Sequence, residues 1–228
     1  MKKIKFPVIP LEHVKGVLID LDNTLYLFDE ANIRALKFVH AFVKKEIKIS
    51  FGAFYQEVRD AFVERFSQIG ETPAAHGRFP IFQNIMEAHR INNAWKWAYE
   101  MEKIYWRNLL KRIKPDKNGV EFLKECKKKG IPVCIVTNLF ATIQVAKIKK
   151  LRIDDYIADI VSNDYVGVDK PHPDMFEEAL KRLGLKAPDV IMIGDNQEKD
   201  IDGAAKVGIQ GYKVSPPLQN KSCQSFNF

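Results

Sequence analysis

The sequence of 228 residues has few cysteines and no long apolar stretch. Its three cysteines, Cys126, Cys134 and Cys223, are spaced for neither a zinc site nor a disulfide framework, so we expect reduced structural thiols. No segment approaches the roughly 20 uninterrupted apolar residues that cross a bilayer, and the lysine-rich start precedes no long apolar region. Internal repeats and low-complexity segments are also missing. We therefore predict a soluble, unsecreted, cytoplasmic protein without a membrane partner.

The formal net charge of +7 is compatible with anionic partners, but the basic residues are scattered. The densest clusters are Lys127 to Lys129, and Lys147 with Lys149 and Lys150. We place both clusters late in predicted helices, where cations suit the negative end of the helix dipole. Nucleic-acid binding would need a recognition motif or an aromatic–basic surface pattern, and neither is present. We therefore expect no nucleic acid among the partners.

Four short apolar runs each end in polar residues, and each is too compact for a helix. They are Val14 to Ile19, Ile131 to Val136, Ile157 to Val161, and Val190 to Ile193. Such runs predict buried strands. Helical patterns follow them, for example over Gly119 to Lys129 and over Pro173 to Leu183. This alternation predicts an α/β fold with a Rossmann-like, doubly wound parallel sheet and helices on both faces.

Between residues 28 and 114 the pattern changes to long segments with helical spacing and no convincing strand. The predicted helices are Ala31 to Lys45, Phe51 to Ile69, and Ala94 to Leu110. Gly70 to Pro80 reads as a loop between them. We therefore predict a sheet domain of residues 1–27 and 115–228, with an inserted α-helical domain of residues 28–114. From Ser215 onward, two prolines followed by Ser, Gln and Asn predict a poorly ordered tail.

The polar residues that follow the predicted strands form one group, because ligands of an open parallel sheet gather beyond the carboxyl ends of its strands. The group comprises Asp20, Asp22, Thr137, Asn138, Lys170, Asp195 and Asp200. Its carboxylates suit a small divalent cation that keeps several waters, and magnesium is the natural candidate. Without a cation these carboxylates would repel one another. With a lysine and a hydroxyl nearby, the group meets the requirements of phosphoryl transfer, including a carboxylate nucleophile.

Each member of this group also has a structural interpretation. Asp-x-Asp turns such as Asp20 and Asp22 occur at helix starts and in calcium loops. Lys170 alone reads as a solvated loop lysine, and Thr137 alone as a helix cap. The joint pattern favours function, because four polar clusters each follow an apolar strand in the proper order.

Four segments together resemble the motifs of the haloacid dehalogenase-like hydrolases. They are Asp20 to Leu25, Thr137-Asn138, Lys170 to Asp174, and Gly194 to Ala204. The resemblance spans nearly all of the chain, and the helical insertion after the first segment is similar to that family's helical cap. It implies a magnesium-dependent phosphatase that hydrolyses a small phosphomonoester through a phosphoaspartyl intermediate.

The resemblance also implies a role for each motif residue. Asp20 would be the nucleophile, and Asp22 would protonate the leaving alkoxide and then deprotonate the attacking water. Thr137 and Lys170 would hold the phosphoryl oxygens, and Asn138 would supply a backbone or side-chain donor.

The metal set implied by the resemblance is the Asp20 carboxylate, the Asp22 backbone carbonyl and Asp195, while Asp200 would support the site and Lys170. Family members that are dehalogenases resemble the chain less, because they lack an acidic residue equivalent to Asp22, and a halide leaves without a proton. A phosphomutase would use the same acid and base. A noncatalytic binding module that retains the fold is a further alternative, against which the complete acid set argues.

Substrate specificity would lie in the predicted cap, which in capped relatives closes over the active site. His76, Arg78 and Arg107 are candidate anion contacts there, although each reads more simply as an ordinary exposed residue. A closed cap implies a small phosphorylated metabolite as partner. Sugar phosphates, nucleotides, glycerol phosphate and phosphoglycolate all stay open, as does a monomer or a homodimer.

Overall fold

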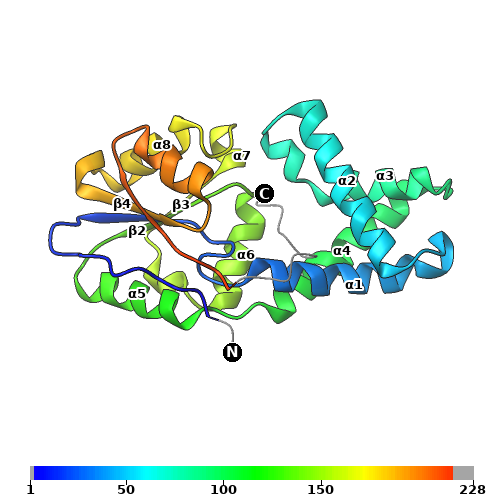
Figure 1. Cartoon of the computed structure of the whole chain (residues 1–228), viewed down its shortest axis with the longest axis horizontal. Helices are drawn as coiled ribbons and strands as arrows, with labels where there is room; N and C mark the ends of the chain where they lie inside the picture. Colours follow the sequence, from blue (N-terminus) through cyan, green and yellow to red (C-terminus); the bar gives the residue numbers. More distant parts are fainter. Residues whose placement is uncertain (1–2, 218–228) are drawn as a thin grey trace. The chain divides into compact units, whose positions relative to one another are not determined.

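The computed structural model describes residues 3–217. The chain divides into two compact units, Met1–Phe28 with Ile113–Phe228, and Asp29–Arg112. The first unit carries the five-stranded sheet and the second is helical (Figure 1). Among residues 3–217, no helix combines the length and apolar character that a membrane span requires.

The sheet of the first unit is parallel throughout. Its strands are β1 (Gly16–Ile19), β2 (Val133–Thr137), β3 (Asp159–Ser162), β4 (Val190–Gly194) and β5 (Gln210–Lys213). β1, β2 and β4 are buried along their whole length, which explains why their sequences are continuous apolar runs. The predicted doubly wound parallel fold is confirmed. Sequence reasoning missed β5, an edge strand whose partly exposed residues form no apolar run.

Helices connect the strands of the first unit and cover both faces of its sheet. They are α5 (Lys117–Lys128), α6 (Ala141–Leu151), α7 (Asn163–Val166), α8 (Pro173–Leu183) and α9 (Gly203–Ala205), with the short 3₁₀ helices η2 (Asp154–Tyr156) and η3 (Ala187–Asp189) and the π-helix η4 (Gln197–Asp202). Figure 1 shows α5 and α6 on one side of the sheet and α8 on the other. α8 packs Met175 and Phe176 into a core with Leu18 and Met192 of the strands. The helices predicted over 119–129 and 173–183 are confirmed as α5 and α8.

The strand order β3-β2-β1-β4-β5 fixes where a ligand can bind. The chain leaves β1 first toward β2 and β3, and later returns to the other side of β1 as β4 and β5. Such a reversal opens a crevice at the carboxyl ends of the two strands that flank it, here β1 and β4. Asp20 follows β1, Asp195 follows β4, and Thr137 ends β2 beside them.

The second unit contains the remaining helices of the described chain. They are α1 (Phe28–Ile47), α2 (Phe51–Ile69), η1 (Pro73–His76), α3 (Arg78–Ala88) and α4 (Ala94–Arg112). The three helices predicted here are confirmed as α1, α2 and α4. The predicted loop over Gly70 to Pro80 is wrong at its end, because α3 begins at Arg78 and contains Pro80 in its first turn. Proline is tolerated there, since the first N–H groups of a helix have no helical acceptor.

Arg78 is buried in the second unit rather than exposed, and so is His76. Arg78 donates a hydrogen bond to the His76 carbonyl oxygen at 2.9 Å. Its guanidinium carbon lies 4.5 Å from the ring centroid of Phe62 and 5.3 Å from that of Tyr105. A guanidinium can pack flat against aromatic rings, so Arg78 forms part of this unit's interior. Arg107 is exposed, as expected.

The start of the predicted tail is ordered by pairing. Ser215 forms an antiparallel bridge with Lys5, with N···O distances of 2.9 and 3.0 Å. The remainder of the predicted tail from residue 218, which includes Cys223, lies outside the described residues. Cys126 and Cys134 are free, buried thiols, and burial raises the pKa of each to about 12. These two are therefore unreactive structural thiols, as predicted.

Candidate active site

Asp20 lies at the carboxyl end of β1, buried against a lysine that a distant loop supplies. The Lys170 Nζ donates to Asp20 Oδ1 at 2.8 Å and to Asp200 Oδ1 at 2.6 Å. All three residues are buried, so these ion pairs are shielded from water. Lys170 is thus held between two carboxylates and is not the solvated loop lysine of the alternative interpretation.

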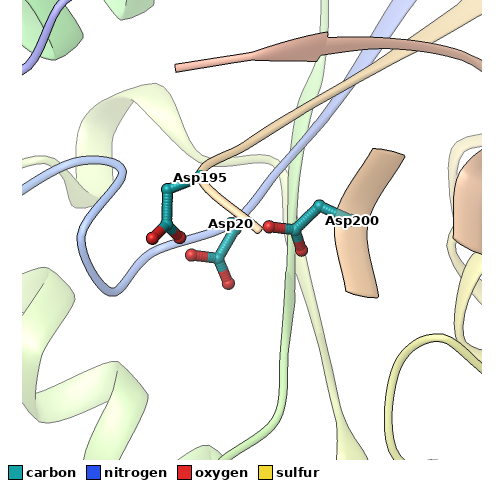
Figure 2. A group of neighbouring side chains, drawn as sticks. All are labelled: Asp20, Asp195 and Asp200. Carbon is teal, nitrogen blue, oxygen red and sulfur yellow. The ribbon is translucent and has the colours of Figure 1, made fainter. Parts of the chain in front are cut away.

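The charges around Asp20 are unbalanced. Asp20, Asp195 and Asp200 each offer a carboxylate oxygen, and these oxygens all lie within 4.8 Å of one another (Figure 2). Burial raises the pKa of Asp20 to about 7; Lys170 opposes this rise, whereas Asp200 and Asp22 add to it. Burial alone would lower the pKa of Lys170, but Asp20 and Asp200 carry it above its usual value. Three carboxylates facing one ammonium leave an excess of negative charge, which a divalent cation would balance.

The hydrogen bonds of Asp200 distinguish it from the other two carboxylates. Its Oδ1 accepts from Lys170, and its Oδ2 accepts from the backbone N–H of Asn196 at 3.0 Å. Gly194 leaves the space that this carboxylate occupies, because a Cβ there would lie 2.2 Å from Asp200 Oδ2. Both carboxylate oxygens of Asp200 therefore already accept hydrogen bonds from protein groups. A cation would take its ligands chiefly from Asp20 and Asp195.

Asn138 fixes the loop that carries Lys170. Its side-chain Nδ2 donates to the Lys170 carbonyl oxygen at 3.0 Å, and its Oδ1 accepts from the Lys170 N–H at 2.7 Å. These two hydrogen bonds fix the position of the Lys170 backbone, from which its side chain extends to Asp20. These contacts use Oδ1 and one of the two Nδ2 N–H groups, so the second Nδ2 N–H and the backbone N–H are the donors that Asn138 could offer to a substrate.

Asp22 follows Asp20 by two residues and contacts a different set of groups. Its carboxylate accepts from the Tyr26 hydroxyl, from Lys147 Nζ at 2.8 and 2.7 Å, and from Gln144 Nε2 at 3.3 Å. The same Gln144 amide donates to the hydroxyl oxygen of Thr137. Gln144 thereby links Asp22 to Thr137 and leaves the Thr137 O–H to donate elsewhere.

Sequence reasoning missed Gln144 and Lys147. It grouped Lys147 with Lys149 and Lys150 as cations near a helix end, which is wrong for Lys147, a fully buried residue. A signal was present: Gln144, Lys147, Ile148 and Leu151 follow helical spacing along one face of α6, and all are buried. Two polar residues on the apolar face of a helix indicate a polar partner within the core.

The matched family model covers residues 14–208 and describes a haloacid dehalogenase-like hydrolase. The chain is 32% identical over 214 residues to a ribulose-1,5-bisphosphate 5-phosphatase of Halopiger xanaduensis. The match covers 92% of this chain and 88% of the relative. It is 25% identical over 201 residues to a glyceraldehyde 3-phosphate phosphatase of Pyrococcus furiosus, covering 88% of this chain and 80% of the relative. These matches show that this protein, with its parallel sheet and the acidic residues at the switch point, is a hydrolase. The chain is a member of the haloacid dehalogenase-like hydrolases, on their phosphatase branch.

Solved structures share this fold at low sequence identity. A 2-haloacid dehalogenase from Pseudomonas syringae superposes with a TM-score of 0.71 at 19% identity, covering 87% of this chain and 85% of the other. A phosphatase of the same family from Thermococcus onnurineus gives a TM-score of 0.63 at 19% identity, covering 94% and 90%. These likenesses establish the architecture, and the chemistry follows from the residues of this chain.

Proposed function

We propose that this hydrolase is a magnesium-dependent phosphatase that cleaves a small phosphomonoester through a phosphoaspartyl intermediate on Asp20. The observation that carries the proposal is the buried Asp20 at the switch point of the sheet, which is bonded to Lys170 and lies close to the Asp195 carboxylate. A carboxylate nucleophile needs adjacent positive charge to approach an anionic phosphoryl group, and Lys170 provides part of it.

In the first step, a carboxylate oxygen of Asp20 attacks phosphorus, and the bond from phosphorus to the leaving-group oxygen breaks. Asp22 transfers a proton to that oxygen, so that an alcohol leaves instead of an alkoxide. Lys170 and the Thr137 O–H stabilise the charge on the phosphoryl oxygens. Gln144 supports this role of Thr137, because its donation to the hydroxyl oxygen directs the O–H away from the amide.

In the second step, Asp22 is a carboxylate and removes a proton from a water molecule. The resulting hydroxide attacks the phosphorus of phospho-Asp20, and the acyl phosphate bond breaks. Inorganic phosphate leaves, Asp20 is again a carboxylate and Asp22 again carries a proton. One group thus serves as acid and then base, which requires a carboxyl that exchanges protons in both steps.

Magnesium fits the oxygen ligands on this edge of the sheet. The residues that would hold it are Asp20 and Asp195 by their carboxylates, and Asp22 by its backbone carbonyl. When bound, magnesium supplies positive charge that lowers the repulsion between the nucleophile and the phosphoryl oxygens. Lys170 and Asp200 contribute the neighbouring protein charges, and the bonds from Asn196 and Lys170 hold Asp200 in its supporting role.

We assign substrate selection to the helical insertion, placed at residues 28–114, as a cap domain. A site over which such a cap closes would favour a small phosphorylated metabolite over a macromolecule. The two phosphatase relatives described above are named for sugar phosphates of five and three carbons, and this supports the same substrate class here. A monomer or homodimer meets these requirements, since every group assigned a chemical role lies in one chain.

A panel of phosphomonoesters tests the proposed function and substrate class. With magnesium present, we expect glyceraldehyde 3-phosphate or ribulose 1,5-bisphosphate to give a kcat/KM at least about tenfold above that of nucleotide monophosphates and phosphoserine, since binding contacts separate such substrates by this order. Phosphate release measures the rates. Release of chloride from a 2-haloacid without phosphate release from any ester would contradict the phosphatase and favour the dehalogenase.

Replacing Gly194 by alanine is expected to reduce kcat by about 100-fold, because small displacements of catalytic groups cost rates of this order. The new Cβ would lie 2.2 Å from Asp200 Oδ2, so the carboxylate must move and Lys170 loses its placement. Turnover of the best panel substrate measures the effect. Gly52→Ala is the control, because a Cβ at that position meets no atom closer than 3.8 Å. Unchanged kcat in Gly194→Ala would show that the position of Asp200 does not matter.

A further inference from the structure

Lys147 is a fully buried lysine whose ammonium meets the carboxylate of Asp22. Its Nζ lies 2.8 Å from Oδ1 and 2.7 Å from Oδ2, so both oxygens are engaged by one group. The ammonium also lies 5.1 Å from the ring centroid of Phe28 and 5.8 Å from that of Tyr26. Burying a charged amine costs free energy unless the amine is paired, so the contact with Asp22 is what allows Lys147 to be buried as an ammonium.

Gln144 lies one helical turn before Lys147 and completes the arrangement. Its Nε2 donates to Asp22 Oδ2 and to the hydroxyl oxygen of Thr137. Both residues lie on the buried face of α6, so the packing of this helix fixes where their side chains begin. Tyr26 adds a donor to Asp22 Oδ1, so donors approach the Asp22 carboxylate from two separate segments of the chain.

We propose that Gln144 and Lys147 are positioning residues for proton transfer, fixing the Asp22 carboxylate in the orientation from which it serves the leaving group. The inference rests on the proposed function, but it adds two residues that lie outside the four family motifs. Both residues act through the Asp22 carboxylate, and neither is assigned a contact with the phosphoryl group. The contact from Gln144, at 3.3 Å, is longer than both contacts from Lys147, so Lys147 holds the carboxylate more strongly than Gln144 does.

This role predicts a dependence on the leaving group. An alkyl phosphate needs a proton on its leaving oxygen, whereas 2,4-dinitrophenolate leaves without one. Misplacing Asp22 should therefore slow phosphoryl transfer from alkyl esters and spare transfer from the activated aryl ester. kcat/KM reports this first step, and general acid catalysis typically contributes about 10²- to 10⁴-fold. A purely structural role for Lys147 would lower both rates together.

The test uses Lys147→Met, which keeps most of the side-chain length and removes the charge. We expect kcat/KM for the best alkyl substrate of the panel to fall by about 100-fold and that for 2,4-dinitrophenyl phosphate by less than about threefold. Lys150→Met, an exposed position on the same helix, should change neither value. Lys147→Arg should recover part of the alkyl activity, because a guanidinium can also donate to both carboxylate oxygens.

A double-mutant cycle with Asp22→Asn decides whether Lys147 acts through Asp22. In the Asp22→Asn background, Lys147→Met should cause no further loss with the alkyl ester. Gln144→Met supplies an independent readout if Lys147→Met does not fold, with an expected alkyl-selective loss of about tenfold. Equal losses on both esters, or a full additional loss in the cycle, would overturn the positioning role while leaving an active phosphatase. A wild type inactive on both esters would instead reject the proposed function itself.

Discussion

Turnover should be abolished in Asp20→Asn, with kcat falling by about 10⁴-fold or more, as loss of a covalent nucleophile does elsewhere. The amide has nearly the shape of the carboxylate but cannot form the acyl phosphate. Lys170 retains its second partner, Asp200, at 2.6 Å, so the site should stay folded. Hydrolysis of para-nitrophenyl phosphate with saturating magnesium measures the loss.

Asp155→Asn is the matched control for this experiment, because it makes the same chemical change at an exposed position. It should turn over at the wild-type rate. Rapid acid quenching of the wild type should also trap a phosphorylated peptide that contains Asp20, and the trapped species should be absent from Asp20→Asn. Near-normal activity of Asp20→Asn would defeat the covalent mechanism.

Removal of divalent cations should also stop turnover. Asp20, Asp195 and Asp200 crowd their oxygens within 4.8 Å, and Lys170 alone does not balance them against an incoming phosphate. We expect a rate loss of about 10³-fold or more in excess chelator, recovered on adding magnesium, because cation stabilisation of phosphoryl charge is worth several kcal/mol. A titration of rate against free magnesium gives the half-saturating concentration.

Variants at two carboxylates separate a direct ligand from a supporting residue. Asp195→Asn should raise the half-saturating magnesium concentration by at least about 100-fold, since even partners of metal ligands contribute 10- to 100-fold. Asp200→Asn should lower kcat with a smaller change in that concentration, because Asp200 already bonds Lys170 and the Asn196 N–H. Undiminished rates in excess chelator would contradict the metal site.

The parallel sheet and the order of its polar strand ends were predictable from local patterns. A strand buried on both faces must be apolar throughout, so β1, β2 and β4 stand out in the sequence as short uninterrupted runs. β5 was missed because an edge strand needs no such run. α3 was not predicted, because Thr72-Pro73 and Gly77 indicated a loop that extended to Pro80, although the first turn of a helix tolerates proline.

The residue types of the four motifs can be read from the linear chain: an aspartate pair after the first strand, a threonine after the second, a loop lysine and a later acidic cluster. How these groups are held becomes visible only in the folded protein. Lys170 lies 150 residues from Asp20, and Lys147 lies 125 residues from Asp22. Hydrophobic spacing marks the positions of a helix that are buried, but not which distant charge a buried lysine will meet. That partner is set by how α6 packs against the loop that follows β1, and a buried lysine near a helix end is therefore indistinguishable in sequence from a solvated one.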